Sequence, residues 1–144
     1  MIQQAQVKDA CTIAGLALLL WEDNTLPEME AMFTQLLSGP EAAVFLAYRD
    51  GEAVGFAQCQ LRHDYVEGTD SSPVGYLEGI FVKESFRHRG YARALLAACE
   101  VWAKEMGCAE FASDCELENT ESLKFHMAMG FEEANRVICF KKNI

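Results

Sequence analysis

The segment YLEGIFV at residues 76–82 runs directly into KESFRHRGYAR at residues 83–93. The first part is expected to form a strand, and from Gly90 the apolar residues repeat with helical spacing. Gly79 falls in the middle of the expected strand, where a glycine often marks a bulge or a close backbone approach. A bulge separates neighbouring strands and leaves backbone N–H and C=O groups free to pair with an extended ligand.

The loop between this strand and this helix has the composition of an anion site. Gly90 and Ala92 leave the backbone open, so several N–H groups at the helix start can face one anion. Arg87, Arg89 and Arg93 add positive charge, which favours a pyrophosphate. The alternative is an ordinary basic helix start with a capping glycine.

The elements on either side can be assigned from periodicity and turn residues. They are a helix over 10–20 capped by Asp9, a helix opened by Pro27 and ended by Gly39, strands over 42–48 and 53–61 joined at Asp50-Gly51, the strand 74–82, the helix from Gly90 to Gly107, a short strand over 110–114, a helix from Asn119 or Thr120 to Met129 ended by Gly130, and a strand over 136–142. This order, ααβββαβαβ, predicts a mixed α/β or α+β sheet in a single domain spanning residues 1–144.

The length and charge of the chain argue against a membrane protein, a secreted protein and a nucleic-acid-binding protein. The chain has 144 residues, no apolar run long enough to span a membrane and no basic region at its start typical of a signal peptide. Its net charge is −10, and residues 1–82 contain 12 acids against 3 bases. An acidic field repels nucleic acid and favours a polycationic partner, although it can also serve solubility alone.

The six cysteines show no Cys-x-x-Cys spacing, and most lie in apolar stretches. We expect buried reduced thiols in a cytoplasmic protein rather than disulfides. His63, His88 and His126 lie far from any cysteine pair, so no metal site is expected. A catalytic cysteine stays open as an alternative.

Two motifs resemble the GNAT superfamily of acyl-CoA-dependent N-acyltransferases. Arg87-His88-Arg89-Gly90-Tyr91-Ala92 matches its Arg/Gln-x-x-Gly-x-Gly/Ala signature, and Asn119 followed by His126 and Gly130-Phe131 resembles its second signature. The resemblance covers the whole chain. It implies the GNAT fold, with order βααβββαβαβ and a mostly antiparallel central sheet split by a bulge near Gly79.

More closely, the chain resembles the aminoglycoside 6′-N-acetyltransferases. The similar segments are Arg62–Val66, Asp70–Pro73, Leu77–Val82, Ala112–Asp114 and Glu118–Thr120. The resemblance implies transfer of acetyl from acetyl-CoA to the 6′-amino group of a cationic aminoglycoside, without a metal, by direct amine attack in a ternary complex. It also implies a cytoplasmic homodimer and antibiotic resistance.

By the same resemblance, individual residues receive roles. The cofactor-binding residues are Ile80, Phe81 and Val82 along the pantetheine arm, Arg87, His88, Arg89, Gly90, Tyr91 and Ala92 at the pyrophosphate, and Asn119 opposite them. The substrate-binding residues are Trp21, Asn24, Tyr65, Glu78, Asp114 and Asn135. The catalytic residues are Asp114 and Glu78 as proton acceptors and His126 as the general acid.

Some of these residues also have structural interpretations. Ile80 and Val82 can be strand core, and Trp21 can be core at a helix end. Glu78 and Asp114 fall at the centre of expected strands, where an uncompensated buried carboxylate costs several kcal/mol, so a functional role is favoured. His126 stands where many GNAT enzymes place a tyrosine that protonates the leaving thiolate, and a structural role for it is equally open.

Other functions share part of this pattern. An acetyltransferase acting on a protein or another small amine would share the cofactor motifs, with a groove suited to peptide backbone in the case of a protein. A non-catalytic acyl-CoA sensor would retain the loop but lose the carboxylates. A zinc or thiol hydrolase lacks ligands, and a dinucleotide enzyme lacks the full Gly-x-Gly-x-x-Gly.

Overall fold

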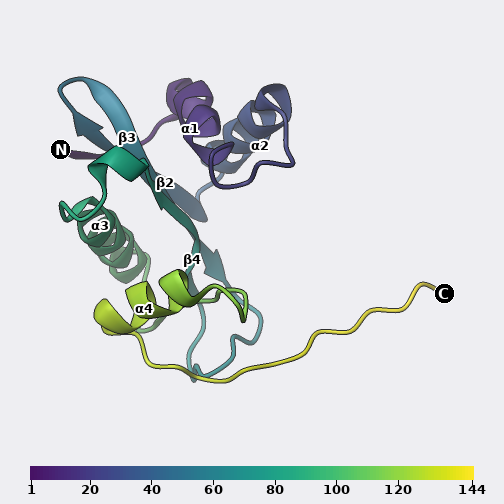
Figure 1. Cartoon of the computed structure of the whole chain (residues 1–144). Helices are drawn as coiled ribbons and strands as arrows, with labels where there is room; N and C mark the ends of the chain where they lie inside the picture. Colours follow the sequence, from purple (N-terminus) through teal and green to yellow (C-terminus); the bar gives the residue numbers. More distant parts are fainter.

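The computed structural model describes residues 1–144 and contains one five-stranded sheet whose strand order follows the chain, β1-β2-β3-β4-β5 (Figure 1). Neighbouring strands are antiparallel except β4 and β5, which are parallel. The strands are β1 (Ile2–Gln4), β2 (Ala42–Arg49), β3 (Glu52–Arg62), β4 (Val74–Val82) and β5 (Phe111–Ser113); the helices are α1 (Ala10–Ala17), α2 (Leu26–Ser38), α3 (Tyr91–Glu105) and α4 (Thr120–Ala128), with short 3-10 turns η1 (Val7–Asp9) and η2 (Glu84–Phe86). The mixed sheet predicted from the sequence is confirmed. The first strand, which only the GNAT resemblance implied, is also confirmed, as β1.

Helices cover both faces of the sheet, with α1 and α2 on one side and α3 on the other (Figure 1). Alternate residues of β2 divide between the two cores: Val44 and Leu46 pack under α1 and α2, whereas Phe45 packs under α3. Side chains alternate along a strand, so a strand covered on both faces must be apolar at every position. The uninterrupted apolar run of β2 therefore reflects burial on both sides.

Local signals account for most of the turns. Asp50 and Gly51 have φ values of 50° and 81°, as a two-residue hairpin between β2 and β3 requires. Gly90 has φ 86° and begins α3, and Thr25 caps α2 by accepting a hydrogen bond from the Glu28 amide at 3.4 Å. The first helix is shorter than predicted and ends at Ala17, after which the Leu19 and Leu20 amides bond to the carbonyls three residues earlier. Asp9 does not cap this helix through its side chain, because its carboxylate accepts from the Gln6 amide.

The predicted bulge near Gly79 is confirmed. Gln58 pairs with Gly79 and Cys59 pairs with Leu77, so Glu78 is the extra residue on β4. β4 also loses its other neighbour here, because pairing with β5 ends at Leu77 and Ser113. We call the region beyond these two residues, where the strands separate, the fork.

The predicted strand over 136–142 is wrong for the isolated chain. Residues 131–144 form no helix or strand, and Val137, Ile138 and Phe140 are 66%, 82% and 91% exposed. Within this C-terminal segment, Asn135 donates to Glu67 at 2.9 Å. The residues after Asn135 then run away from the body of the protein (Figure 1). No strand of the same chain lies beside residues 136–142, so the ladder cannot form. We call residues 136–144 the arm.

The six cysteines are all free, and no helix is both long and apolar enough to cross a membrane. The expectation that most are buried is wrong: Cys59 and Cys99 are buried and Cys108 is partly buried, but Cys11, Cys115 and Cys139 are exposed. Two of the exposed cysteines, Cys115 and Cys139, lie after β5 in segments that belong to no helix or strand.

Candidate active site

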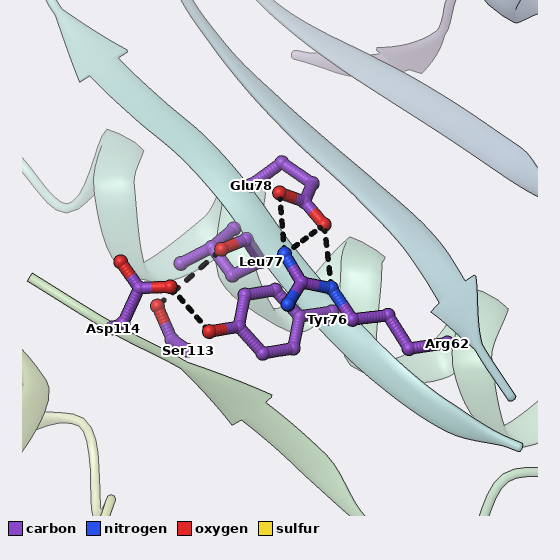
Figure 2. Close-up of polar contacts among 6 residues, drawn as sticks. All are labelled: Arg62, Tyr76, Leu77, Glu78, Ser113 and Asp114. Atoms are coloured by element: carbon purple, nitrogen blue, oxygen red, sulfur yellow. Dashed lines mark hydrogen bonds and ion pairs between the residues drawn. The ribbon is translucent and has the colours of Figure 1, made fainter. Parts of the chain in front are cut away.

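Four polar side chains meet on the sheet beside the fork (Figure 2). Arg62, at the end of β3, donates to Glu78 from Nε at 3.1 Å and from Nη2 at 2.9 and 3.0 Å. Its guanidinium carbon also lies 3.4 Å from the centre of the Tyr76 ring. The Tyr76 hydroxyl in turn donates to Asp114. The bulge places Glu78 within reach of Arg62, so the ion pair depends on the shift in strand register at this position.

Arg62 and Glu78 compensate each other's charge. The Glu78 side chain is 19% exposed, and both of its oxygens accept from Arg62. The sequence favoured a functional cation as the partner of a buried Glu78, but the partner comes from the chain itself. Sequence reasoning missed Arg62 as a site residue; its place among only three bases in residues 1–82 is the signal that could have found it.

Asp114 therefore carries the uncompensated negative charge of this cluster. It follows the last residue of β5 and is exposed, rather than buried in mid-strand as the sequence suggested. Burial and the hydrogen bond to Asp114 raise the pKa of the Tyr76 phenol well above its ordinary value. Tyr76 thus remains a donor to Asp114 at neutral pH and holds that carboxylate at the fork.

The two faces of the sheet present different groups at the fork. Leu77 packs in the core beneath α3, so its neighbour Tyr76 points to the opposite face. Trp21 lies on that opposite face, where its ring contacts Phe56 with centroids 5.9 Å apart and approaches Gly79. His126 lies on the α3 and α4 side, with Nε2 2.8 Å from the Ser113 hydroxyl. An acidic and aromatic face thus lies opposite a serine and histidine face.

The remaining predicted substrate residues, Asn24, Tyr65 and Asn135, lie in three separate loops. Tyr65 is 77% exposed, as expected for a residue in a polar loop. The Asn24 side chain donates to the Trp21 carbonyl at 3.1 Å and so fixes the turn after α1. Asn135 is bonded to Glu67 at the start of the arm. The structure shows these contacts but no shared contact among Asn24, Tyr65 and Asn135.

The loop between β4 and α3 has the geometry of an anion site. Both His88 and Gly90 have positive φ, 62° and 86°, and Gly90 has no neighbour within 4 Å of where a Cβ would lie. Arg87 donates from Nε to the Val82 carbonyl at 2.9 Å, which ties the loop to the end of β4. His88, Arg89 and Arg93 are exposed around the free amides of the first turn of α3. The residues present therefore fit a bound pyrophosphate.

The other predicted cofactor residues have structural roles as well. Val82 is buried in the α3 core, whereas Ile80 is partly buried against that core and Phe81 is partly buried against the α1 and α2 core. Residues 79–82 pair with β3 alone, which leaves their second edge open. Asn119 caps α4 by accepting from the Ser122 amide at 3.1 Å.

Comparison with known proteins agrees with this geometry. Residues 13–131 match the acetyltransferase (GNAT) family. An aminoglycoside N(6′)-acetyltransferase type 1 of Stenotrophomonas maltophilia is 50% identical over 141 residues, 97% of this chain and 91% of that protein. The enzyme of the same name from Salmonella typhimurium is 49% identical over 128 residues, 89% and 88% of the two chains.

A solved structure is similar over the whole chain. AAC(6′)-Iy in complex with the bisubstrate analog CoA-S-monomethyl-acetylneamine superposes with a TM-score of 0.96 at 45% identity, covering 100% of this chain and 98% of that one. The full-length match includes the bulged strand and the helix-start loop described above. This protein therefore belongs to the acetyltransferase (GNAT) family, among relatives that are aminoglycoside N(6′)-acetyltransferases.

Proposed function

We propose that this protein transfers acetyl from acetyl-CoA to the 6′-amino group of aminoglycosides and thereby confers resistance to them. The observation that carries the proposal is the position of Asp114, an exposed carboxylate held by Tyr76 where β4 and β5 separate. At this point a cationic amine and an extended thioester can meet, one from the acidic face and the other along the open edge of β4.

Acetyl-CoA supplies the activated acetyl group and fits the fork and the adjoining loop. Backbone groups of Ile80 and Val82 pair with the amides of the pantetheine arm, as a further strand would. The loop Arg87–Ala92 holds the pyrophosphate at the start of α3. Asn119 contacts the cofactor from the α4 side, with its amide nitrogen left free by the cap.

The aminoglycoside is a polycation and is attracted by the acidic half of the protein. Twelve acids against three bases in residues 1–82 give the approach to the fork a negative potential. Trp21 and Tyr65 offer aromatic surfaces to the sugar rings, and Asn24 and Asn135 offer hydrogen-bonding groups. Asp114, whose charge no cation of the chain compensates, attracts the ammonium groups near the acetyl carbonyl, beside the Arg62–Glu78 pair.

The chemistry requires a neutral amine, because an ammonium has no lone pair with which to attack a thioester. An amine with an ordinary pKa near ~10 is mostly protonated at neutral pH. Asp114 takes one proton from the ammonium directly or through water. The nearby Glu78, held by Arg62, gives this part of the site a fixed geometry. The amine then attacks the acetyl carbonyl directly, and backbone N–H groups at the bulge stabilise the developing oxyanion.

Thiol release from acetyl-CoA tests the function. Purified protein is assayed with kanamycin, tobramycin or a lysine-bearing peptide, and NMR of the product locates the acetyl group. We expect rapid release with the aminoglycosides, acetylation at the 6′ nitrogen and none with peptide. Release with peptide alone would establish a protein acetyltransferase, and tight acetyl-CoA binding without turnover would establish a sensor.

We also propose that the protein is a homodimer joined by exchange of the arm. The outer edge of β5 has no neighbouring strand, and the arm carries apolar side chains with nothing to pack on. Open strand edges favour pairing with another chain, and exchange of identical segments is a common way to form dimers. All 22 acids of the chain precede the arm, which contains Arg136, Lys141 and Lys142, so its charge complements the body of a partner.

A cytoplasmic location is part of the same proposal. All six cysteines are free, and three of them are exposed. Exposed thiols persist in a reducing compartment, which supports the cytoplasm as the place where the protein works.

A further inference from the structure

His126 cannot reach the fork with either ring nitrogen, because both are already engaged. Nδ1 lies 2.7 Å from the Ser122 carbonyl oxygen, one turn earlier in α4, and Nε2 lies 2.8 Å from the Ser113 hydroxyl. The edges of Phe125 and Phe131 fix the ring, with centroids 5.6 and 5.1 Å away. Any proton that leaves His126 toward the fork must therefore pass through Ser113.

Ser113 lies at the apex of the fork. It pairs with Leu77, the last residue of β4 that has a β5 partner, and its hydroxyl points toward the Leu77 carbonyl (Figure 2). The Leu77 carbonyl is 3.4 Å from the Ser113 oxygen, a long contact compared with 2.8 Å to His126. The hydroxyl is thus firmly held on the His126 side and only weakly held on the side of the fork.

The site accommodates both charge states of His126. A carbonyl oxygen only accepts hydrogen bonds, so Nδ1 carries a hydrogen in either state. In the neutral ring, Nε2 accepts from the Ser113 hydroxyl. In the imidazolium, Nε2 donates to the Ser113 oxygen and the hydroxyl hydrogen turns to another acceptor. A negative atom in the fork is such an acceptor.

We propose that Ser113 is the group that protonates the leaving thiolate of acetyl-CoA, and that His126 recharges it; this rests on the acetyl transfer proposed above. When the C–S bond breaks, its electron pair stays on sulfur and takes the hydroxyl proton of Ser113. The Nε2 proton of the imidazolium moves to the Ser113 oxygen, and the Nδ1 hydrogen stays on Nδ1, donated to the Ser122 carbonyl. After the thiol departs, solvent in the fork returns a proton to the Ser113 oxygen as the Ser113 hydroxyl proton passes back to Nε2.

This step completes the proton balance of the reaction. An ammonium has three N–H hydrogens and the amide product keeps one, so two protons leave the nitrogen. One is released before attack and one after the C–N bond forms, both on the Asp114 face. One proton enters sulfur on the His126 face, so one proton is released overall. Asp114 and Ser113 act on opposite sides of the same carbonyl carbon.

The test compares kcat and the KM for acetyl-CoA in Ser113→Ala, Ser113→Thr and His126→Gln. We expect Ser113→Ala and His126→Gln to lower kcat by about a hundredfold, the lower end for general acid catalysis because a thiolate is already a fair leaving group. The KM for acetyl-CoA should change by less than about threefold, because the step uses the proton and not the binding contacts. Ser113→Thr keeps the hydroxyl and should retain most of the activity.

A double variant separates the relay from two independent contacts. Because the residues act in series, Ser113→Ala combined with His126→Gln should be no slower than the slower single variant. His63→Gln is the matched control, since His63 is exposed and bonds only to Glu41 at 2.7 Å. Thermal unfolding of each variant sets an assay temperature at which all are folded.

Three results would overturn the relay. They are an unchanged kcat in Ser113→Ala, losses that multiply in the double variant, and an acetylated Ser113 found by mass spectrometry, which would make it a nucleophile instead. The proposed function is judged separately, by the acceptor that the wild-type protein uses. If that acceptor is a peptide, the same variant ratios are measured with it.

Discussion

The Trp21 ring lies so close to the backbone of Gly79 that a Cβ at position 79 would come within 2.6 Å of Trp21 Cζ2. The glycine marks the residue after the bulge, so the close approach joins the turn after α1 to the strand that carries Glu78. This is a steric requirement for glycine and not a conformational one, since Gly79 has no positive φ. The ring also forms the wall of the proposed acceptor site.

Gly79→Ala should therefore displace Trp21. We expect a loss of about 1–3 kcal/mol in the free energy of unfolding, as for other overpacked sites, and a higher KM for the aminoglycoside. Chemical denaturation and steady-state kinetics measure the two effects. Gly15→Ala in α1 is the control, because nothing lies within 4 Å of its Cβ position and alanine favours a helix. Equal stability of the two variants would contradict the steric argument.

Asp114→Asn should lower kcat/KM for aminoglycosides by about a hundredfold, since the amide has the shape of the carboxylate without its basicity. The Tyr76 hydroxyl can still donate to the amide oxygen, so the unfolding midpoint should hardly change. Asp64→Asn, an exposed change in the neighbouring loop, serves as the control. A loss below tenfold would exclude Asp114 as the proton acceptor.

Arg62→Met should destabilise the fold by about 1–3 kcal/mol, because Glu78 would keep its charge at low exposure without its three hydrogen bonds. Adding Glu78→Gln removes the unpaired charge and should recover part of that stability. Urea denaturation of both variants measures the effect. Arg49→Met, which breaks an exposed pair with Asp50, should cost much less.

Tyr76 gives the stability a dependence on alkaline pH. Its pKa is raised in the folded protein, so the native state favours the neutral phenol. That contribution is complete below the unfolded value near ~10 and declines as the pH rises beyond it. The stability difference between wild type and Tyr76→Phe should therefore shrink from about pH 9 to about pH 11. A constant difference across this range would show that the two states titrate alike.

Ile138→Asp combined with Phe140→Asp should convert the dimer to a monomer. Both side chains are exposed in the single chain, at 82% and 91%, so the change has no reason to unfold it. Light scattering after size-exclusion chromatography measures the mass. Met32→Glu, at an exposed position of α2, is the control and should remain dimeric. A monomeric wild type, or a dimeric double variant, would refute arm exchange.

Local chemistry made much of the fold predictable. Asp50-Gly51, Gly90 and Asn119 each determine a turn or cap within a few residues, and each lies where the sequence suggests. The bulge near Gly79 was also predictable, since a glycine in mid-strand pointed to it, whereas the extra residue, Glu78, is identified by the strand register. These signals depend on neighbours along the chain and need no knowledge of distant contacts.

The errors concern contacts between distant residues. The pairing of Arg62 with Glu78 depends on strand register, and the Ser113 contact of His126 depends on how α4 packs on β5. The apolar residues within 136–142 predicted a strand, but a strand also needs a neighbour, which the single chain does not provide. Asp114 was placed in mid-strand because strand ends are hard to locate from composition.

The bulge at Glu78 also sets the facing of every residue that follows it on β4. Leu77 packs under α3, and so do Ile80 and Val82, although an odd and an even position would normally face opposite sides. The extra residue absorbs the mismatch. Loss of this codon would leave Leu77 and Ile80 two positions apart, so Ile80, Phe81 and Val82 would keep their facing in a regular strand, while the carboxylate and the bulge would be lost. The extra residue is therefore needed for the bulge and its carboxylate, and not for the burial of the core residues that follow it.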